Sequence, residues 1–281
     1  MSDQFSCDKI REQMKVIPNI NPQFEVERRI SFIKSTLVHS GLTHLVLGIS
    51  GGIDSTTCGK LAQLAVDQLN KEYFDPKYFF IAVRLPYGTQ ADEADAKKSL
   101  AFILPSKSIL IDIKSSVDSI HKEIIASANI DTTYNKHNFK EDFAKGNTKA
   151  RIRMTAQYEI AGLFNGLVIG TDHSAENITG FYTKWGDGAC DLAPLFGLSK
   201  RQVRQIAAFL DAPLALINKT PTADLECLAP QKSDEHALGI TYDEIDDFLE
   251  GKPVSATTIN AIITVFQKTT HKRDSVPTIY D

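Results

Sequence analysis

The sequence lacks the features that mark several common classes of protein. No apolar run reaches about 18 residues, so no segment is expected to span a membrane. The start, MSDQFSCDKI, contains no apolar stretch of the kind that a secretory signal peptide needs. There is no internal repeat and no low-complexity tract. These absences favour a cytoplasmic protein without a membrane partner.

Cysteine and surplus positive charge are also scarce. The four cysteines, Cys7, Cys58, Cys190 and Cys227, are widely spaced, so we expect neither a zinc site nor a disulfide framework. The 31 Lys and Arg residues are outnumbered by 35 Asp and Glu residues, which gives a formal net charge of −4. Because a dedicated nucleic-acid binder usually presents a basic face, this balance argues against a nucleic-acid partner.

What the sequence does contain is an alternation of predicted helices and strands. Apolar spacing, with caps such as Asn21 and Ser199, predicts helices over 21–41, 56–69, 91–102, 148–164 and 199–210. Short apolar runs predict strands over 45–49, 78–83, 109–113 and 166–170, and the polar stretch 129–147 is expected to be a mobile loop. This alternation predicts an α/β fold, a parallel sheet with helices on both faces and ligands at the carboxyl ends of its strands. We expect one domain over 21–281, after a lead over 1–20.

The most informative motif follows the strand over 45–49 and opens the next helix. It reads Gly48, Ile49, Ser50, Gly51, Gly52, Ile53, Asp54, Ser55. Glycines let backbone N–H groups approach a ligand closely, and a helix N-terminus behind them favours an anion. An ordinary strand–helix turn capped by Asp54 is the simpler alternative, but it leaves the glycines and serines without a role. No Gly-Lys-Ser/Thr triplet is present, so this is not the Walker phosphate loop.

A carboxylate beside a polyphosphate requires a cation between them, so Asp54 points to magnesium. A helix dipole contributes only ~0.3–1 kcal/mol, which is too little to offset the repulsion. Mg²⁺ is typically held by one or two carboxylates together with substrate phosphates. Glu176, after the strand over 166–170, is the second candidate ligand; the alternative is a glutamate favoured only by a helix start. His173 is interpreted as a hydrogen-bonding or core histidine rather than a ligand.

The glycine-rich loop over 181–191 combines aromatic rings with Lys184, Asp187 and Asp191. Binding and catalytic residues concentrate on such loops, although a solvated turn with Asp187 in an Asx role is the alternative. Lys200 lies at the first turn of the helix over 199–210, where the dipole disfavours a cation. A bound anion explains that placement best, and Lys200→Ala is then expected to lose activity without losing stability.

Seven segments together resemble the ammonia-dependent NAD synthetases, a family of the N-type ATP pyrophosphatases. They are SGGIDS at 50–55, AVRLPYG at 82–88, GNTKARIRM at 146–154, GTDHSAENITGFYTKWGDG at 170–188, LSKRQVRQ at 198–205, PTADLE at 221–226 and HKR at 271–273. The resemblance implies a Rossmann-like sheet of the adenine-nucleotide hydrolase type and a homodimer. It also implies a ligase that adenylates deamido-NAD with ATP and Mg²⁺. Ammonia then gives NAD, AMP and pyrophosphate, the last step of NAD biosynthesis.

The same resemblance implies roles for individual residues. ATP is expected to meet the loop over 48–55, Arg84, Gln90, Thr171, Lys200 and Thr222. Magnesium is expected at Asp54 and Glu176. Deamido-NAD is expected to meet Arg151, Lys184, Asp191, His271 and Lys272. Asp187 falls where the family places a residue near ammonia, so the expected catalytic residues are Asp187, Lys200 and Asp54.

Two other functions stay open at the level of sequence. A tRNA-modifying or GMP-forming pyrophosphatase would share the phosphate loop, but the tRNA type usually has a basic face and often paired cysteines. A non-catalytic ATP-binding module, such as a stress-type sensor, would need neither Glu176 nor the loop around Asp187.

Ammonia rather than glutamine is the expected nitrogen donor. Glutamine use normally requires a cysteine nucleophile in an added domain of at least ~100–200 residues. Cys7 lies in the lead with no expected core around it, Cys58 lies within a helix, Cys190 has no base adjacent in sequence and Cys227 has no partner. Asp187 could instead hold ammonium and accept its proton.

The helix over 148–164 is apolar over a broad arc. Its apolar residues include Ile152, Met154, Tyr158, Ile160 and Leu163. A helix that is apolar nearly all round is usually buried, so we expect this one to pack against a two-fold mate.

Overall fold

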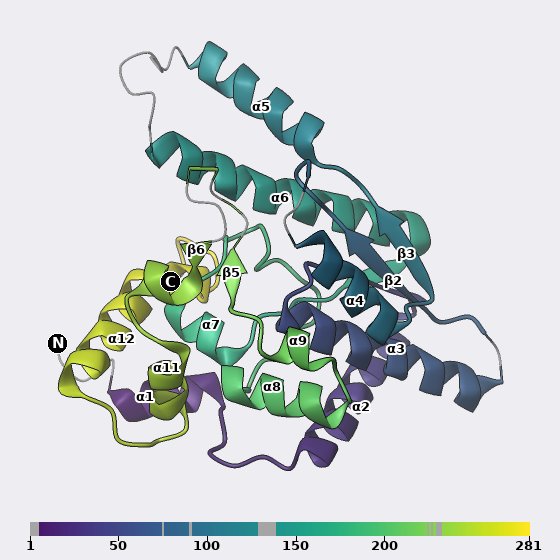
Figure 1. Cartoon of the computed structure of the whole chain (residues 1–281), viewed down its shortest axis with the longest axis horizontal. Helices are drawn as coiled ribbons and strands as arrows, with labels where there is room; N and C mark the ends of the chain where they lie inside the picture. Colours follow the sequence, from purple (N-terminus) through teal and green to yellow (C-terminus); the bar gives the residue numbers. More distant parts are fainter. Residues whose placement is uncertain are drawn as a thin grey trace.

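A four-stranded parallel sheet lies at the centre of the molecule (Figure 1). The structure is a computed structural model that describes residues 6–74, 76–89, 92–128, 139–223, 225, 227–228 and 232–281. The strands are β1 (His44–Gly48), β2 (Phe79–Arg84), β3 (Lys107–Leu110) and β4 (Gly166–Val168), in the order β3-β2-β1-β4. The chain runs outward from β1 to β3 and then returns to the other side of β1. This reversal of strand order opens a crevice at the carboxyl ends of β1 and β4.

Alternate residues of β1 face two different helical layers, as a buried parallel strand requires. Leu45 and Leu47 belong to the apolar cluster of α3 (Ile53–Tyr73). Val46, between them, packs in the cluster of α6 (Phe139–Phe164). Helices therefore cover both faces of the sheet, and the predicted α/β fold is confirmed.

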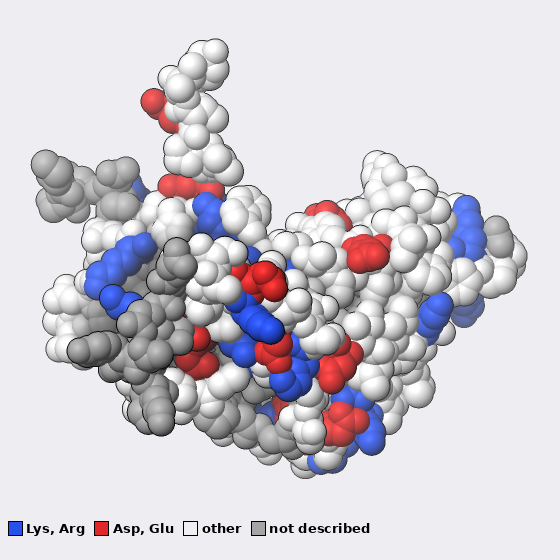
Figure 2. Space-filling view, turned by 90° about the horizontal axis from the view of Figure 1, so that it is seen from above, with Lys and Arg blue, Asp and Glu red and all other residues white. Residues whose placement is uncertain are grey.

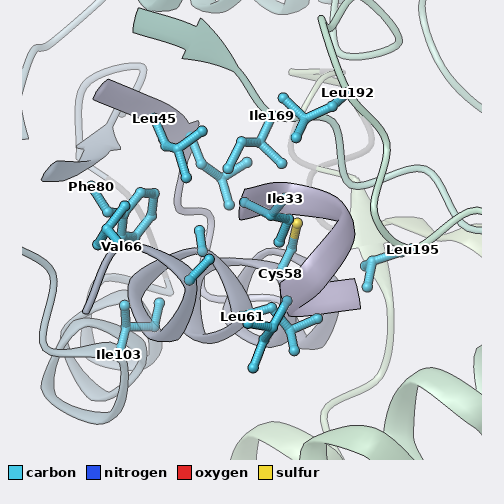
Figure 3. Packing of buried hydrophobic residues seen from close by; sticks show 14 of the residues in the cluster. Ile33, Leu45, Cys58, Leu61, Val66, Phe80, Ile103, Ile169, Leu192 and Leu195 are labelled. Atoms are coloured by element: carbon cyan, nitrogen blue, oxygen red, sulfur yellow. The ribbon is translucent and has the colours of Figure 1, made fainter. Parts of the chain in front are cut away.

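The layer around α3 contains most of the large core. It also includes α2 (Pro22–Ser40), α4 (Glu93–Ile103) and α8 (Lys200–Phe209), whereas α5 (Lys114–Ser127) lies beside α6. Figure 3 shows Ile33 and Ile103 from the helices converging with Phe80 from the sheet. This packing fixes the start of α3, where the phosphate-loop motif lies.

The predicted caps are present. Asn21 accepts a hydrogen bond from the backbone N–H of Phe24 at 3.1 Å, and α2 ends at Gly41 with a φ of 70°. Ser199 and Gln202 exchange both hydrogen bonds of a capping box at the start of α8. Local sequence therefore determined where these two helices begin.

A second, smaller bundle lies beside the sheet, on the left in Figure 1. It consists of α1 (Cys7–Met14), α7 (Ser174–Thr179), α11 (Tyr242–Leu249) and α12 (Ala256–Lys268). Ile10 and Met14 are buried in it, and Cys7 packs against it. The expectation that Cys7 has no core around it is therefore wrong: the spacing of Ile10 and Met14 gives α1 an apolar side that the bundle covers.

The other short elements connect these two parts. They are α9 (Leu214–Ile217), β5 (Thr222–Ala223), β6 (Lys232–Ser233), α10 (Asp234–Leu238) and the 3₁₀ turn η1 (Thr270–Lys272). β5 and β6 form a small antiparallel pair. Together they bring segments of the last third of the chain to the carboxyl end of the large sheet.

The prediction of a loop over 129–147 is wrong for the second half of that segment. Residues 129–138 lie outside the described residues, but α6 already begins at Phe139. Gly146 packs against Leu225, and the Lys149 ammonium group donates to the Leu225 carbonyl at 2.7 Å. These tertiary contacts stabilise a helical turn that its polar sequence does not predict.

Two strand limits also differ from the prediction. The third strand spans 107–110 instead of 109–113, and the fourth ends at Val168 because Ile169 pairs outside it with Leu192. The helix over 114–127 went unpredicted, although Val117, Ile120 and Ile124 recur at helical spacing.

Among the described residues, no helix combines the length and the apolar character that crossing a membrane demands. Figure 2 shows acidic and basic side chains interleaved on the face it presents, without a broad patch of one sign. The visible surface thus agrees with the balanced composition.

Candidate active site

A cavity of about 290 Å³ opens at the carboxyl ends of β1 and β4, where the strand order reverses. Its walls come from the loop after β1, the loop after β4, the starts of α3 and α8, and the side of α6. It contains eleven of the predicted site residues: Gly48, Ile49, Ser50, Gly52, Ile53, Asp54, Ser55, Thr171, Glu176, Asp187 and Lys200. Residues from distant parts of the sequence therefore meet where the fold predicts a ligand.

The loop over 48–55 has the geometry of an anion site. Gly51 has a φ of +84°, and a Cβ there would lie 2.7 Å from the backbone nitrogen of Ala96. Only glycine fits this turn. Gly52 then caps α3 without any side-chain hydrogen bond, and Ser50 and Ser55 lie 3.2 Å apart by their hydroxyl oxygens. Backbone N–H groups, hydroxyl groups and a helix N-terminus are thus gathered around one side of the cavity.

Two carboxylates and one ammonium group meet above this loop. Lys200 Nζ donates to Asp54 Oδ2 at 2.6 Å and lies 4.0 Å from Glu176 Oε1. His173 Nε2 lies 3.5 Å from Asp54 Oδ1 and 3.4 Å from Glu176 Oε1. His173 Nδ1 accepts from the backbone N–H of Glu176, so this buried histidine caps α7 as well.

The charges in this group stabilise one another. Burial alone would raise the pKa of Asp54, but Lys200 and His173 outweigh burial and hold it below its ordinary value. Burial acts to lower the pKa of Lys200, yet Asp54 and Glu176 keep it raised. Asp54 therefore stays ionised and Lys200 stays protonated at neutral pH.

Two further carboxylates, those of Asp172 and Asp187, belong to residues that line the same cavity. Burial raises the pKa of Asp172 well above its ordinary value, and the charges of Glu176 and Asp187 add to the effect. Burial also raises the pKa of Asp187, although its Oδ1 accepts a hydrogen bond from the backbone N–H of Thr183 at 2.9 Å. Carboxylates with raised pKa values are stronger bases than ordinary ones.

The residues expected to hold a dinucleotide form a separate group outside the cavity. Arg151 donates to the Lys184 carbonyl at 3.3 Å, and Lys184 Nζ donates to the His271 carbonyl. Lys272 Nζ instead donates to the carbonyls of Gly180 and Tyr182. The structure thus gathers Arg151, Lys184 and His271 and turns the Lys272 ammonium group toward the chain itself.

The remaining predicted residues have varied positions. Arg84 is buried in an ion pair with Glu93 and does not line the cavity. Asp191 accepts from the backbone N–H of Val168 at 2.7 Å at the end of β4. Gln90 lies outside the described residues, and Thr222 is described only as backbone of β5.

Sequence reasoning missed several residues of the cavity. Asp172, Arg153, Gln157, Lys219 and Asp234 also line it. Asp172 adjoins the predicted Thr171 at a strand end, so its position was a usable signal. Gln157 accepts from the backbone N–H of Gly48 at 2.6 Å, and Lys219 bridges Asp92 and Asp95. These two contacts join residues far apart in sequence and have no local signal.

Comparisons with known proteins agree with this geometry. A family model described as NAD synthase matches residues 25–276. The NH(3)-dependent NAD(+) synthetase of Vibrio campbellii is 61% identical over 272 residues, covering 97% of this chain and 99% of the relative. The crystal structure of NAD+ synthetase from Burkholderia pseudomallei is similar with a TM-score of 0.81 and 47% identity, covering 95% of each chain. The NMN synthetase from Francisella tularensis is similar with a TM-score of 0.77 and 31% identity, covering 92% and 99%.

Proposed function

The chain belongs to the NAD synthase family, and we propose that it is an ammonia-dependent NAD synthetase. In this reaction ATP adenylates the carboxylate of deamido-NAD and releases pyrophosphate. Ammonia then replaces AMP, and NAD is the product. The observation that carries the proposal is a single cavity in which an anion-binding loop, a carboxylate pair and a buried lysine meet.

The site fits a divalent cation between Asp54 and Glu176. One ligand atom each from Asp54, His173 and Glu176 lie within 4.8 Å of one another. Asp54 Oδ1 is buried without a hydrogen bond, so it has a free lone pair directed into the group. Carboxylate oxygens are the ligands that Mg²⁺ prefers, and we assign it to Asp54 and Glu176. When bound there, Mg²⁺ would screen the charge of the ATP phosphates.

The chain's own residues perform the remaining tasks. Backbone N–H groups of the loop over 48–55 hold the pyrophosphate, and Lys200 neutralises charge that grows on it as it leaves. Asp187 faces the same cavity and holds the amine nucleophile. When ammonia forms the new C–N bond and AMP departs with the electron pair of its C–O bond, Asp187 accepts the surplus proton.

The group of Arg151, Lys184 and His271 serves the second half of the dinucleotide in this proposal. It lies outside the cavity, where the adenylate of deamido-NAD would extend beyond the reacting carboxylate. A mononucleotide substrate would not need it. The similarity to the Francisella NMN synthetase makes this distinction worth measuring.

One assay tests the proposal. The purified protein is mixed with ATP, Mg²⁺ and ammonium, and with either deamido-NAD or the corresponding mononucleotide acid. We expect NAD, AMP and pyrophosphate from deamido-NAD, and much slower amidation of the mononucleotide. Formation of AMP without any amide product, or preference for the mononucleotide, would refute the assignment.

The nitrogen donor is tested in the same assay. Burial raises the pKa of the Cys190 thiol to about 11, so it is a poor nucleophile at neutral pH. Burial also raises the pKa of Cys58. We therefore expect ammonium salts, and not glutamine, to support turnover, and Asp187→Asn to impair it. Efficient glutamine use that is lost in Cys190→Ala would contradict this.

A further inference from the structure

Gln157 of α6 makes a contact that no step of the proposed reaction has yet used. Its Oε1 accepts a hydrogen bond from the backbone N–H of Gly48 at 2.6 Å, and its side chain lines the active-site cavity. Gly48 is the last residue of β1 and the first of the loop over 48–55. The hydrogen bond therefore joins α6 to the point where the phosphate loop begins.

This contact occupies a position that belongs to β4 in a continuous sheet. The peptide groups of a central parallel strand face its two neighbours in alternation. On the β4 side, the Val46 carbonyl accepts from the N–H of Ile169 at 2.9 Å. On the β2 side, the N–H of Ile49 donates to the Val83 carbonyl at 2.8 Å. The N–H of Gly48 therefore faces β4, and in a continued ladder it would donate to the Ile169 carbonyl.

The strand β4 ends too early to supply that partner. Its last residue is Val168, and beyond it Ile169 bridges to Leu192 while the N–H of Gly170 donates to the Leu192 carbonyl at 2.8 Å. A backbone N–H that is removed from water needs an acceptor. Gln157 supplies one, so α6 replaces β4 as the partner of β1 where the crevice opens.

The glycine at position 48 allows this close approach. A Cβ there would lie 3.2 Å from Oε1 of Gln157 and 3.3 Å from its Cδ and Nε2. Contacts of this length are tighter than ordinary van der Waals contacts, so a side chain on Gly48 would push the amide group away. The position of Gln157 and the glycine at the start of the loop therefore belong together.

The preceding turn of α6 makes a similar contact at β2. Arg153 Nε donates to the carbonyl of Leu85, directly after β2, at 3.1 Å. The Arg153 carbonyl in turn accepts from Nε2 of Gln157 at 3.3 Å. Both polar atoms of the Gln157 amide therefore have partners within the chain. Because Arg153 and Gln157 are four residues apart, they lie on one side of α6, and both line the cavity.

A neutral acceptor is the suitable group at this place. A carboxylate instead of the amide would accept the same hydrogen bond, but its charge would repel the phosphates that the loop binds. On its other side the loop is already held, because Gly51 packs closely against the backbone of Ala96. We propose that Gln157 is a positioning residue of the ATP site, an inference that rests on the proposed function. It fixes the start of the phosphate loop, so that the N–H groups of the loop face the phosphates of ATP.

The test removes the acceptor and keeps the bulk of the side chain. Gln157→Met and Gln157→Leu both introduce good helix formers, and Gln68→Met, at an exposed position on α3, is the matched control. In both Gln157 variants we expect the KM for ATP to rise at least about tenfold, because the loop loses its fixed start. The KM values for deamido-NAD and ammonium should stay within about twofold of wild type. Gln68→Met should have wild-type values for all three substrates.

A second measurement observes the hydrogen bond itself. Hydrogen exchange of the Gly48 amide, followed by NMR in protein that contains isotopically labelled glycine, should be at least about tenfold faster in Gln157→Met and Gln157→Leu. Gln157→Glu keeps an acceptor, so its Gly48 amide should exchange as slowly as that of wild type, although its charge weakens ATP binding.

Three results would overturn the inference. They are unchanged exchange of the Gly48 amide in Gln157→Met and Gln157→Leu, an unchanged KM for ATP in these two variants, and a parallel rise in all three KM values, which a general structural defect would produce. A wild-type protein that makes no NAD from ammonium, although Gln157→Met still accelerates exchange at Gly48, would instead refute the proposed function on which the inference rests.

Discussion

For Lys200, the position in the sequence and the contacts in the structure lead to different expectations about stability. At the first turn of α8 its charge opposes the helix dipole, which predicted that Lys200 binds an anion. Its side chain is only 1% exposed, however, and its ammonium group forms an ion pair with Asp54. The expected neutral or favourable effect of Lys200→Ala on stability therefore does not survive the tertiary structure, since removal would leave a buried carboxylate without its partner.

We accordingly predict that Lys200→Met lowers the free energy of unfolding by roughly 1–3 kcal/mol, because Asp54 loses a charged hydrogen bond. Asp54→Asn combined with Lys200→Met should recover most of that loss while remaining inactive. Urea denaturation of the two single variants and the double variant measures the coupling. Additive losses in the double variant would show that the pair contributes nothing to stability.

The carboxylate pair leads to a second prediction about activity. Asp54→Asn and Glu176→Gln should each slow adenylation by more than ~10–100-fold, the loss typical of residues that only support a metal ligand. Pyrophosphate release, titrated with Mg²⁺, is the measurement, and Glu12→Gln on the exposed side of α1 is the control. Full activity of either variant at an ordinary Mg²⁺ concentration would show that the substituted residue is not a ligand of the metal.

Asp234 provides a pH-dependent test of the cavity's electrostatics. Burial raises its pKa to about 6, Glu176 adds to the rise and Lys200 opposes it. A carboxyl group with a raised pKa in the folded state binds more protons there than in the unfolded state. Its contribution to stability therefore decreases as pH rises from its ordinary pKa of 3.8 to about 6.

Asp234→Asn should then be more stable than wild type above about pH 6, by roughly 1–3 kcal/mol, and equal to it near pH 4. Unfolding midpoints of both proteins across this range give the difference. Burial also raises the pKa of Asp246 to about 6, so the difference between the proteins is the proper measure, not the wild-type curve. A difference that does not change with pH would contradict the assigned cause.

At the scale of elements, α1 was the least expected part of the fold. The sequence predicted only a lead, yet Ile10 and Met14 are buried in the second bundle. The Met14 carbonyl also accepts a hydrogen bond from the Ser174 hydroxyl at 2.6 Å, at the start of the helix that carries Glu176. This short helix therefore supports one wall of the active site.

We predict that Ile10→Ala or Met14→Ala costs about 2–5 kcal/mol of stability, the range for large-to-small changes in a core. Glu12→Ala, on the exposed side of the same helix, should cost less than about 0.5 kcal/mol. Urea unfolding monitored by circular dichroism makes the comparison. Equal stability of the three variants would show that α1 does not belong to the folded core.

At the scale of the whole molecule, the apolar surface around α5 and α6 predicts self-association. Leu163 is 74% exposed and Phe143 is 60% exposed on α6, and Ile120 and Ile124 are exposed on α5. Within one chain, Leu163 and Phe143 are therefore uncovered, whereas Ile160 of the same helix is buried in the chain's own core. A two-fold interface through these helices would bury the same surface on both partners.

We expect light scattering to give a mass about twice the chain mass of 31.1 kDa. Leu163→Asp should shift the mass toward that of one chain, because it places a charge in the proposed interface. Leu214→Asp is the matched control, since Leu214 is 72% exposed and belongs to α9, not to α5 or α6. A single-chain mass for the wild-type protein at micromolar concentration would contradict the dimer.

The sequence by itself determined the parallel sheet, the caps of α2 and α8 and the anion-binding loop after β1. These features depend on local rules: apolar runs form buried strands, Asn and Ser cap helices, and Gly51 takes a turn that admits no Cβ. It also indicated Asp54 and Glu176, because the loops that follow parallel strands meet at one edge of the sheet. Asp187 was indicated by its glycine-rich loop and by the family resemblance.

Only the tertiary structure decided the rest. The first turns of α6 depend on contacts with Leu225, and the burial of α1 depends on helices more than 150 residues later in the chain. The ion pair of Lys200 with Asp54 and the contact of Gln157 with the phosphate loop are likewise long-range. The residues around each partner in the sequence do not predict such a contact. Packing in three dimensions, and not local propensity, brings the two partners together.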